Sequence, residues 1–380
     1  GAKDYKSVQK AIHSNFLFGV ISSVLATVVG LLFIPTLLTW MKTPAEVMPH
    51  SLLYFRIYFA GVATVILYNI CMSIMQALGD SLHPLYYLIF SSLVNVALDL
   101  LFVAGFHWGA GGAAVATVIA QGLSVVLCLV RMCREEDETV RLDLKRLFGS
   151  LHPRKGAVYG GESLFHKDIL LQAIGQGLPT GIQNSVISIG NIVIQSLING
   201  FGPAVIAGYA AAIKLNNLVI TSFTTLGNGI SNYTAQNLGA GKYDRIHSGF
   251  RAGLKLVWLL CLPIILVYIT FGKELVFLFM DNAEGPAIGT GILILRIFAP
   301  FYLVVSAKLV ADGILRGASL MSQFMTATFT DLILRVLLAA VFSRFLGSVG
   351  IWSAWPIGWL IGTAVSLLFY NRCVKKKFMT

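Results

Sequence analysis

Charged residues are scarce in this sequence. Asp, Glu, Lys and Arg make up 12% of its 380 residues, whereas hydrophobic residues make up 56%. A soluble domain typically carries about twice this share of charge, roughly 25%. Because so few charged side chains cannot cover a water-exposed surface, the composition excludes a soluble globular protein.

The residue patterns that serve catalysis are also missing. The five cysteines are scattered without a disulfide framework or a metal-ligand spacing. None of the seven histidines is spaced as a zinc pair, and the glycine-rich stretches follow expected helices, which argues against a nucleotide-binding loop. His, Asp and Ser do not cluster at one membrane depth, as a membrane-embedded enzyme would require. We therefore expect no enzymatic activity, no cofactor and no use of ATP.

Long apolar runs fill most of the chain. A helix needs about 20 mainly apolar residues to cross the hydrocarbon core, and ten stretches reach that length. Because these runs lack the strict alternation of barrel strands, they predict an all-α polytopic membrane protein. The expected spans are 14–38, 51–78, 84–105, 110–131, 169–198, 204–236, 250–271, 288–315, 320–343 and 350–371.

Basic residues are distributed unevenly between the two sides of these spans. With ten crossings, both termini lie on one side, where twenty Lys and Arg residues fall, against three on the other side, Lys42, Lys273 and Arg344. Basic loops stay in the cytoplasm, so both termini are expected there. The net charge of +11 then reflects topology and anionic lipid headgroups rather than nucleic acid. Tryptophans at the opposite helix ends agree with this orientation: Trp40, Trp108, Trp352 and Trp355.

The sequence repeats itself at a shift of about 238 to 240 residues. Gly1-Ala2 followed by Lys3-Asp4-Tyr5 returns as Gly239-Ala240-Gly241-Lys242-Tyr243, and Arg56-Ile57 returns as Arg296-Ile297. Four helices thus repeat as four helices, and the second half has two more that lack a counterpart. We expect an N-terminal bundle at 1–131, a cytoplasmic linker at 132–168 and a six-helix C-terminal bundle at 169–380. Paired repeats of this kind build many secondary transporters.

Several segments resemble the multidrug and toxic compound extrusion (MATE) family: Gly1-Ala2-Lys3-Asp4-Tyr5, Gln76-Ala77-Leu78-Gly79-Asp80-Ser81, Asn95-Val96-Ala97-Leu98-Asp99, Leu178-Pro179, Gln236-Asn237-Leu238-Gly239-Ala240-Gly241-Lys242 and Leu315-Arg316-Gly317. The resemblance implies a twelve-helix fold of two pseudo-symmetric bundles, of which the first two helices are absent from this sequence. A bundle without those helices is expected not to support transport by itself. The implied activity is export of small organic, often cationic, compounds in exchange for Na⁺ or H⁺. The alternative is a flippase for a lipid-linked saccharide, which would need a more cationic central cavity.

One group of polar residues suits a coupling ion. Asp99 is a carboxylate inside the third span, where ionisable groups are costly and functional by default. Asn95 lies one helical turn earlier on the same face, and Thr117 lies in the next helix. Oxygen ligands of this kind suit a hard cation, and the resemblance implies a cation site at the same three residues. We therefore predict that Asn95, Asp99 and Thr117 bind Na⁺ or a proton, and Na⁺ is the only metal ion expected. The alternative is that Asp99 only caps a helix or forms a hydrogen bond between helices.

Other polar residues in the spans are candidates for the substrate cavity, with interhelical hydrogen bonding as an equal alternative. The candidates are Gln183, Asn184, Asn191, Lys214, Asn217 and Met72, with Asn216 beside them. Lys308 with Asp312 and Asp331 with Arg335 are each four residues apart, so each pair is expected to neutralise itself structurally, with a proton relay or a substrate contact as the alternative. The expected partners are small organic substrates and membrane lipids, with no nucleic acid. We expect a monomeric, multi-pass protein of the plasma membrane.

The charge asymmetry makes a topological prediction. Single cysteines introduced in 132–168 and beside Lys375-Lys376-Lys377 should react with an impermeant maleimide only after cells are opened. The reason is the excess of Lys and Arg on that side. Labelling of either position in intact cells would refute the orientation.

Overall fold

A computed structural model of the chain describes residues 1–40, 43–137, 140–143, 167–280 and 285–375. These residues form helices and connecting loops, and no strand occurs among them. Nine helical stretches in the described ranges are long and apolar enough to cross a membrane, and a bent helix pair makes a tenth. The all-α fold and the ten predicted spans are therefore confirmed. Most of the expected linker lies outside the described residues.

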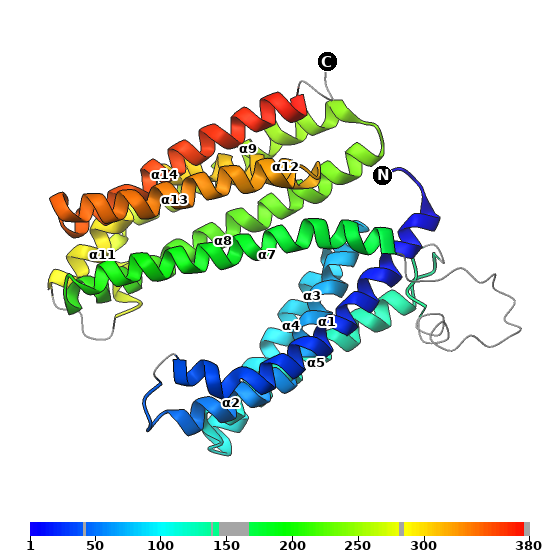
Figure 1. The fold of residues 1–380 in the computed structure, drawn as a ribbon, viewed down its shortest axis with the longest axis horizontal. Coiled ribbons are helices and arrows are strands. Elements are labelled where there is room, and N and C mark those ends of the chain that lie inside the picture. The colour runs from blue at the N-terminus through cyan, green and yellow to red at the C-terminus, as the bar shows by residue number, and fades with distance from the viewer. Residues whose placement is uncertain (41–42, 138–139, 144–166, 281–284, 376–380) are drawn as a thin grey trace, which may run out of the picture. The chain divides into compact units, whose positions relative to one another are not determined.

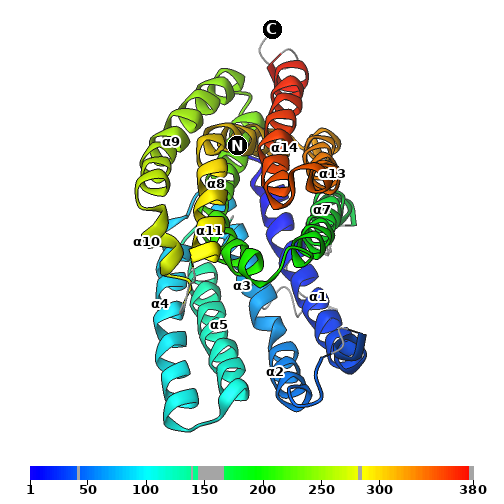
Figure 2. The ribbon, with the colours of Figure 1, turned by 90° about the vertical axis from the view of Figure 1, so that its left-hand side faces the viewer.

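The N-terminal bundle is the compact unit that covers Asp4–Ile174. Its main elements are α1 (Tyr5–Trp40), α2 (Met48–Ala60), α3 (Val62–Ala77), α4 (Leu82–Asp99) with a π-helical end (Leu100–Gly105), and α5 (Gly109–Cys133). Helix α5 is central, because it packs against α2, α3 and α4, while α1 covers α2 and α3. Figure 2 shows α4 and α5 side by side.

The C-terminal bundle is the compact unit of Gly175–Thr380, joined by Gly1–Lys3. Its elements are α7 (Lys167–Asn199), which begins before the unit boundary, α8 (Pro203–Gly239), α9 (Tyr243–Thr270), α10 (Gly272–Phe277), α11 (Gly285–Phe298), a 3₁₀ turn (Ala299–Phe301), α12 (Tyr302–Gly317), α13 (Met321–Leu346), α14 (Ser348–Phe369) and a π-helical end (Tyr370–Lys375). Helix α14 pairs closely with α13, and α12 contacts α8, α9 and α14 (Figure 1).

Two spans are broken at equivalent points of the repeat. Helices α2 and α3 meet at Gly61 with a bend of 44°. A Cβ atom at Gly61 would lie 2.3 Å from the side chain of Val118, so glycine lets α5 pack against the break. In the other bundle the 3₁₀ turn around Pro300 separates α11 from α12. Proline lacks the N–H that a continuous helix needs, which explains the second break.

The repeat extends to the backbone of the loops. Six residues with positive φ fall into three pairs separated by 238 or 240 positions: Lys3 with Gly241, Gly79 with Ser319, and Gly109 with Gly347. Left-handed backbone is costly for any residue with a Cβ atom. Its recurrence at matched positions shows that the two halves share their turn geometry as well as their helices.

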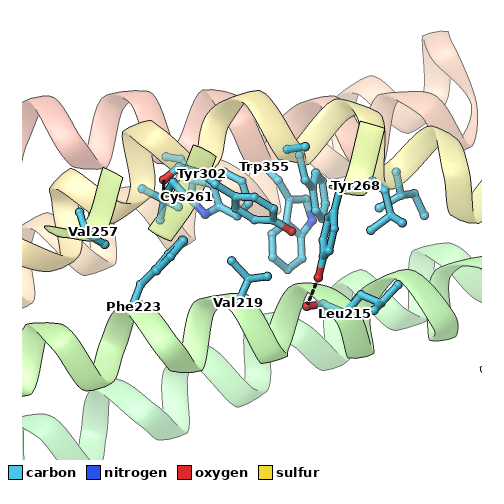
Figure 3. Close-up of a cluster of buried hydrophobic side chains, with 14 of the residues drawn as sticks. Leu215, Val219, Phe223, Val257, Cys261, Tyr268, Tyr302 and Trp355 are labelled. Carbon is cyan, nitrogen blue, oxygen red and sulfur yellow. Dashed lines mark hydrogen bonds between the residues drawn. The ribbon is translucent and has the colours of Figure 1, made fainter. Parts of the chain in front are cut away.

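Aromatic side chains fill the core of the C-terminal bundle. Trp352, Trp355 and Trp359 follow a helical spacing of three and four residues, so they share one face of α14. The Phe298 and Trp355 ring centroids lie 5.1 Å apart, a separation at which aromatic pairs attract. Tyr268 donates a hydrogen bond to the Leu215 carbonyl at 3.0 Å (Figure 3).

Two tryptophans do not lie where the sequence predicted them. Trp352 and Trp355 are 0% and 5% exposed, so the expected headgroup position is wrong for both. Trp40 and Trp108 are exposed, as a headgroup position requires. The difference arises because Trp352 stacks on Tyr209 at 5.4 Å inside the bundle. Many large apolar side chains are exposed on the surfaces of the two bundles, as in a protein that faces lipid.

The described start of the linker is anchored to the N-terminal bundle. The backbone N–H of Asp143 donates to Nε2 of His13 at 3.1 Å. Nδ1 of the same ring lies 2.8 Å from the Gln9 carbonyl oxygen, which can only accept, so the proton sits on Nδ1. Leu142 is 1% exposed among the core side chains. The segment 140–143 is thus part of the bundle.

The loop geometry predicts opposite effects for one chemical change at two glycines. Gly79 has φ of +96° with open space around it, so Gly79→Ala should destabilise the protein by about 1 kcal/mol through backbone strain. Gly289 lies in α11, also in open space, so Gly289→Ala should stabilise by roughly 0.5–1 kcal/mol. Thermal unfolding in detergent measures both. If both substitutions changed the stability in the same direction, the assigned backbone conformations would be contradicted.

Candidate functional site

Asn95 and Asp99 lie one turn apart on α4, both half-buried. Two of their polar atoms, Nδ2 of Asn95 and Oδ1 of Asp99, are buried without a hydrogen-bond partner among the described residues. A buried polar atom without a partner costs on the order of 1–3 kcal/mol, and more if it carries charge. Nδ2 of Asn95 is a donor, so it is Oδ1 of Asp99 that can accept a cation or a proton.

Helix α5 brings further polar groups to the same region. Ser124 on α5 donates to the Tyr87 carbonyl on α4 at 3.4 Å, and Phe102 in the π-helical segment after α4 lies against Gly112 on α5. These two contacts fix an antiparallel register that places Thr117 at the depth of Asn95. The Thr117 hydroxyl donates to the Ala113 carbonyl at 3.0 Å, which leaves its oxygen lone pairs available.

Gln121 on α5 also has a side-chain oxygen, Oε1, that is buried without a partner among the described residues. It lies one turn beyond Thr117, and the register of α4 and α5 places it opposite the Ser91 end of α4, away from Asp99. Carboxylate, amide and hydroxyl oxygens suit a hard cation such as sodium. No His, Cys, Asp and Glu cluster for a transition metal occurs in the described part.

The backbone around these residues is irregular. The π-helical segment Leu100–Gly105 begins directly after Asp99, and such segments frequently occur at functional sites. On the α5 side, Val118 packs into the break at Gly61. The carboxylate and the hydroxyl thus lie beside elements whose helical hydrogen bonding is interrupted.

The predicted cavity residues of the second half fall into different environments. Gln183 is buried, whereas Asn184, Asn191, Lys214 and Asn217 are exposed on α7 and α8. Asn216 is a core residue, because its Oδ1 accepts a hydrogen bond from the Tyr302 hydroxyl at 3.2 Å. In the other bundle, Met72 packs against the core. The four exposed side chains lie on the surface of the C-terminal bundle.

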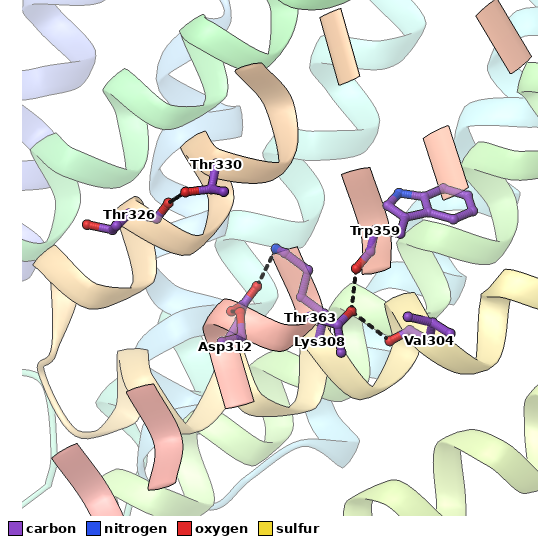
Figure 4. A network of polar contacts seen from close by, with 8 residues as sticks. Val304, Lys308, Asp312, Thr326, Thr330, Trp359 and Thr363 are labelled. Atoms are coloured by element: carbon purple, nitrogen blue, oxygen red, sulfur yellow. Dashed lines mark hydrogen bonds and ion pairs between the residues drawn. The ribbon is translucent and has the colours of Figure 1, made fainter. Parts of the chain in front are cut away.

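The two predicted charge pairs of the second half behave differently. Lys308 and Asp312 form a buried ion pair, with Nζ and Oδ2 2.7 Å apart (Figure 4). Asp331 and Arg335 do not pair: Asp331 Oδ1 and Arg335 Nε have no hydrogen-bond partner among the described residues. The predicted structural pairing is therefore wrong for Asp331, because the Arg335 guanidinium lies over the Trp355 ring, 4.2 Å from its centroid.

Comparisons with known proteins agree with this architecture. The MatE family model matches residues 1–101 and 179–341, which is more than half of the chain. The probable multidrug resistance protein YpnP of Bacillus subtilis strain 168 is 28% identical over 336 residues, covering 88% of this chain and 71% of the relative. The multidrug export protein MepA of Staphylococcus aureus strain MW2 is 22% identical, covering 97% and 78%.

Solved structures show the same fold. An outward-facing multidrug resistance MATE family transporter of the MOP superfamily superposes with a TM-score of 0.88 at 20% identity, over 99% of this chain and 81% of that one. A MOP superfamily transporter from Pyrococcus furiosus, described as having a binding pocket of reverse polarity, superposes with a TM-score of 0.90 at 19% identity, over 100% and 82%. The chain thus belongs to the MATE family of multi-pass membrane transporters, which are not enzymes.

Proposed function

We propose that this MATE family chain is a secondary antiporter that exports small organic, cationic compounds in exchange for Na⁺ or H⁺. The observation that carries this proposal is the buried Oδ1 of Asp99, which has no partner among the described residues and lies one turn from Asn95 on α4. A carboxylate inside the membrane must be neutralised. A sodium ion or a proton does this reversibly, and reversible binding is what coupling requires.

Antiport follows if the ion and the exported compound favour different states of the transporter. An ion that binds the Asp99 carboxylate shifts the population toward the state in which the site is closed around it. A compound that prefers the opposite state is then released as the ion binds, and the coupling is reciprocal. The names of the relatives YpnP and MepA, a probable multidrug resistance protein and a multidrug export protein, support organic compounds as the cargo.

The flippase alternative fits less well. A pyrophosphate-linked lipid needs a surplus of positive charge to hold it, whereas the strongly buried Lys308 and Arg335 are matched in number by Asp312 and Asp331. A balanced interior does not attract a dianion over long range. This balance supports export of organic compounds.

The proposed setting is the plasma membrane, with both termini in the cytoplasm and the protein as a monomer. The support is the excess of basic residues on the side of the termini. Export then moves compounds from the cytoplasm or inner leaflet to the outside, driven by ions that enter down their gradient.

The decisive test is Asp99→Asn in the full-length protein reconstituted in proteoliposomes. This change keeps the shape of the side chain and removes its charge, so gradient-driven export of a fluorescent organic cation should fall at least tenfold. Asp244→Asn, a matched change at an exposed position, should leave export unchanged. Normal export by Asp99→Asn under both sodium and pH gradients would exclude Asp99 as the coupling residue.

A second test separates ion affinity from transport itself. Asn95→Ala removes one candidate ligand but keeps the carboxylate, and a hydrogen bond or ligand contact to a charged partner is worth about 1.5–3 kcal/mol. The sodium concentration for half-maximal export should therefore rise about tenfold or more, while the maximal rate is largely kept. If the sodium dependence is unaltered, Asn95 is not a ligand.

A further inference from the structure

The charged groups in the middle of the C-terminal bundle form one cluster. Lys308 and Asp312 come from α12, and Asp331 and Arg335 from α13. All four residues are at most 8% exposed. The charges of Asp312, Asp331 and Arg335 all act on Lys308. Charges are buried this deeply only at considerable cost, so the cluster calls for a function.

Two glycines of α14, Gly358 and Gly362, leave room for side chains of this cluster. A Cβ atom at Gly362 would lie 2.8 Å from Cβ of Asp331 and 3.0 Å from Cε of Lys308. One turn earlier, a Cβ at Gly358 would lie 2.7 Å from Oδ1 of Asp331. Lys308 and Asp331 therefore meet across the same glycine face, although they come from different helices. One turn beyond Gly362, Ser366 donates to Oδ1 of Asp312 at 2.6 Å.

The two carboxylates have unequal surroundings. Asp312 accepts from Lys308 through Oδ2 and from Ser366 through Oδ1, so it is fully satisfied as an anion. Asp331 is 8% exposed and its Oδ1 has no donor among the described residues. A buried carboxylate needs either a hydrogen-bonded cation or a proton. In this arrangement the nearest ammonium is bound to the other carboxylate.

We propose that Asp331 is a proton-binding site and that Lys308 is its exchangeable counter-ion. With a proton on Asp331, Lys308 binds Asp312, as in this structure. When the proton leaves to water, the Asp331 carboxylate draws the Lys308 ammonium toward it, while the Ser366 hydroxyl continues to hold Asp312. The step forms or breaks a single O–H bond at Asp331, and Lys308 keeps its protons and only changes acceptor.

A proton suits this position better than a metal ion. Sodium would meet the Lys308 ammonium and the Arg335 guanidinium at close range, and both repel it. The other charged groups of the cluster are Lys308 and Asp312 from α12 and Arg335 from the helix of Asp331, and Gly358 and Gly362 of α14 lie against Asp331. No Asp, Glu, Lys or Arg occurs in the described part of α7 after Asp168.

The switch would connect three helices. Lys308 lies two turns after the 3₁₀ break that separates α11 from α12, so a change of its acceptor can be absorbed by a bend at that break. The role of this movement in transport rests on the antiport proposed above. The proposal that Asp331 binds a proton does not rest on antiport, because proton binding can be measured without a transported compound.

The test is infrared difference spectroscopy of the full-length protein in lipid, titrated with pH. A protonated-carboxyl band should titrate in the wild type and in Asp99→Asn, and should be lost in Asp331→Asn. Asp312→Asn frees Lys308 for Asp331, so the midpoint of the band should fall by about one pH unit or more. The double variant Lys308→Met with Asp312→Asn removes the buried pair without leaving a lone charge, and the midpoint should rise.

The midpoint is expected to fall in one variant and to rise in the other. Such opposite shifts can be attributed to the Lys308 ammonium, because a general structural effect of the substitutions would not change sign. A band that persists in Asp331→Asn, or shifts of equal sign in the two Asp312 variants, would overturn the proposal. Loss of export in Asp331→Asn under a pH gradient, with sodium-driven export kept, is the expected transport result. If Asp99→Asn exports normally while the Asp331 band behaves as expected, only the Asp99 proposal fails.

Discussion

The absence of water in the hydrocarbon core is the constraint on which this structure depends. Every backbone N–H and C=O must find its partner within the chain, so the spans are helices and irregular backbone is confined to a few places. Those places are informative. The break at Gly61 is packed by Val118, and the break at Pro300 lies at a residue with no N–H to satisfy.

The same constraint explains why the fold was predictable and parts of the site were not. Ten apolar runs, the repeat and the loop positions follow from composition and spacing, because lipid leaves few alternatives. The π-helical end after Asp99 is not encoded in Leu100–Gly105 by any special residue, so it was not foreseen. The Trp352 and Trp355 side chains illustrate a further limit, since a tryptophan near a span end suits a headgroup or a core equally well until its neighbours are known.

Charge pairing was the least predictable feature. A spacing of four residues is equally present in Lys308 with Asp312 and in Asp331 with Arg335, yet only the first pair forms. In the second, the Arg335 guanidinium instead lies over the ring of Trp355, a residue of another helix. The spacing of residues along one helix does not determine which side chains of other helices they will contact.

The repeat shows that the two bundles share their backbone arrangement but not their buried charged residues. At the shifts of 238 to 240 residues that relate the two halves, no Asp, Glu, Lys or Arg falls opposite Lys308, Asp312, Asp331 or Asp99. The backbone features, by contrast, recur in both halves, including the positive-φ loops and the broken span. The interruption of the span is therefore a property of the scaffold, whereas the buried carboxylates differ between the two halves. The two proposed ion sites, at Asp99 and at Asp331, therefore differ in their residues although they are built on the same scaffold.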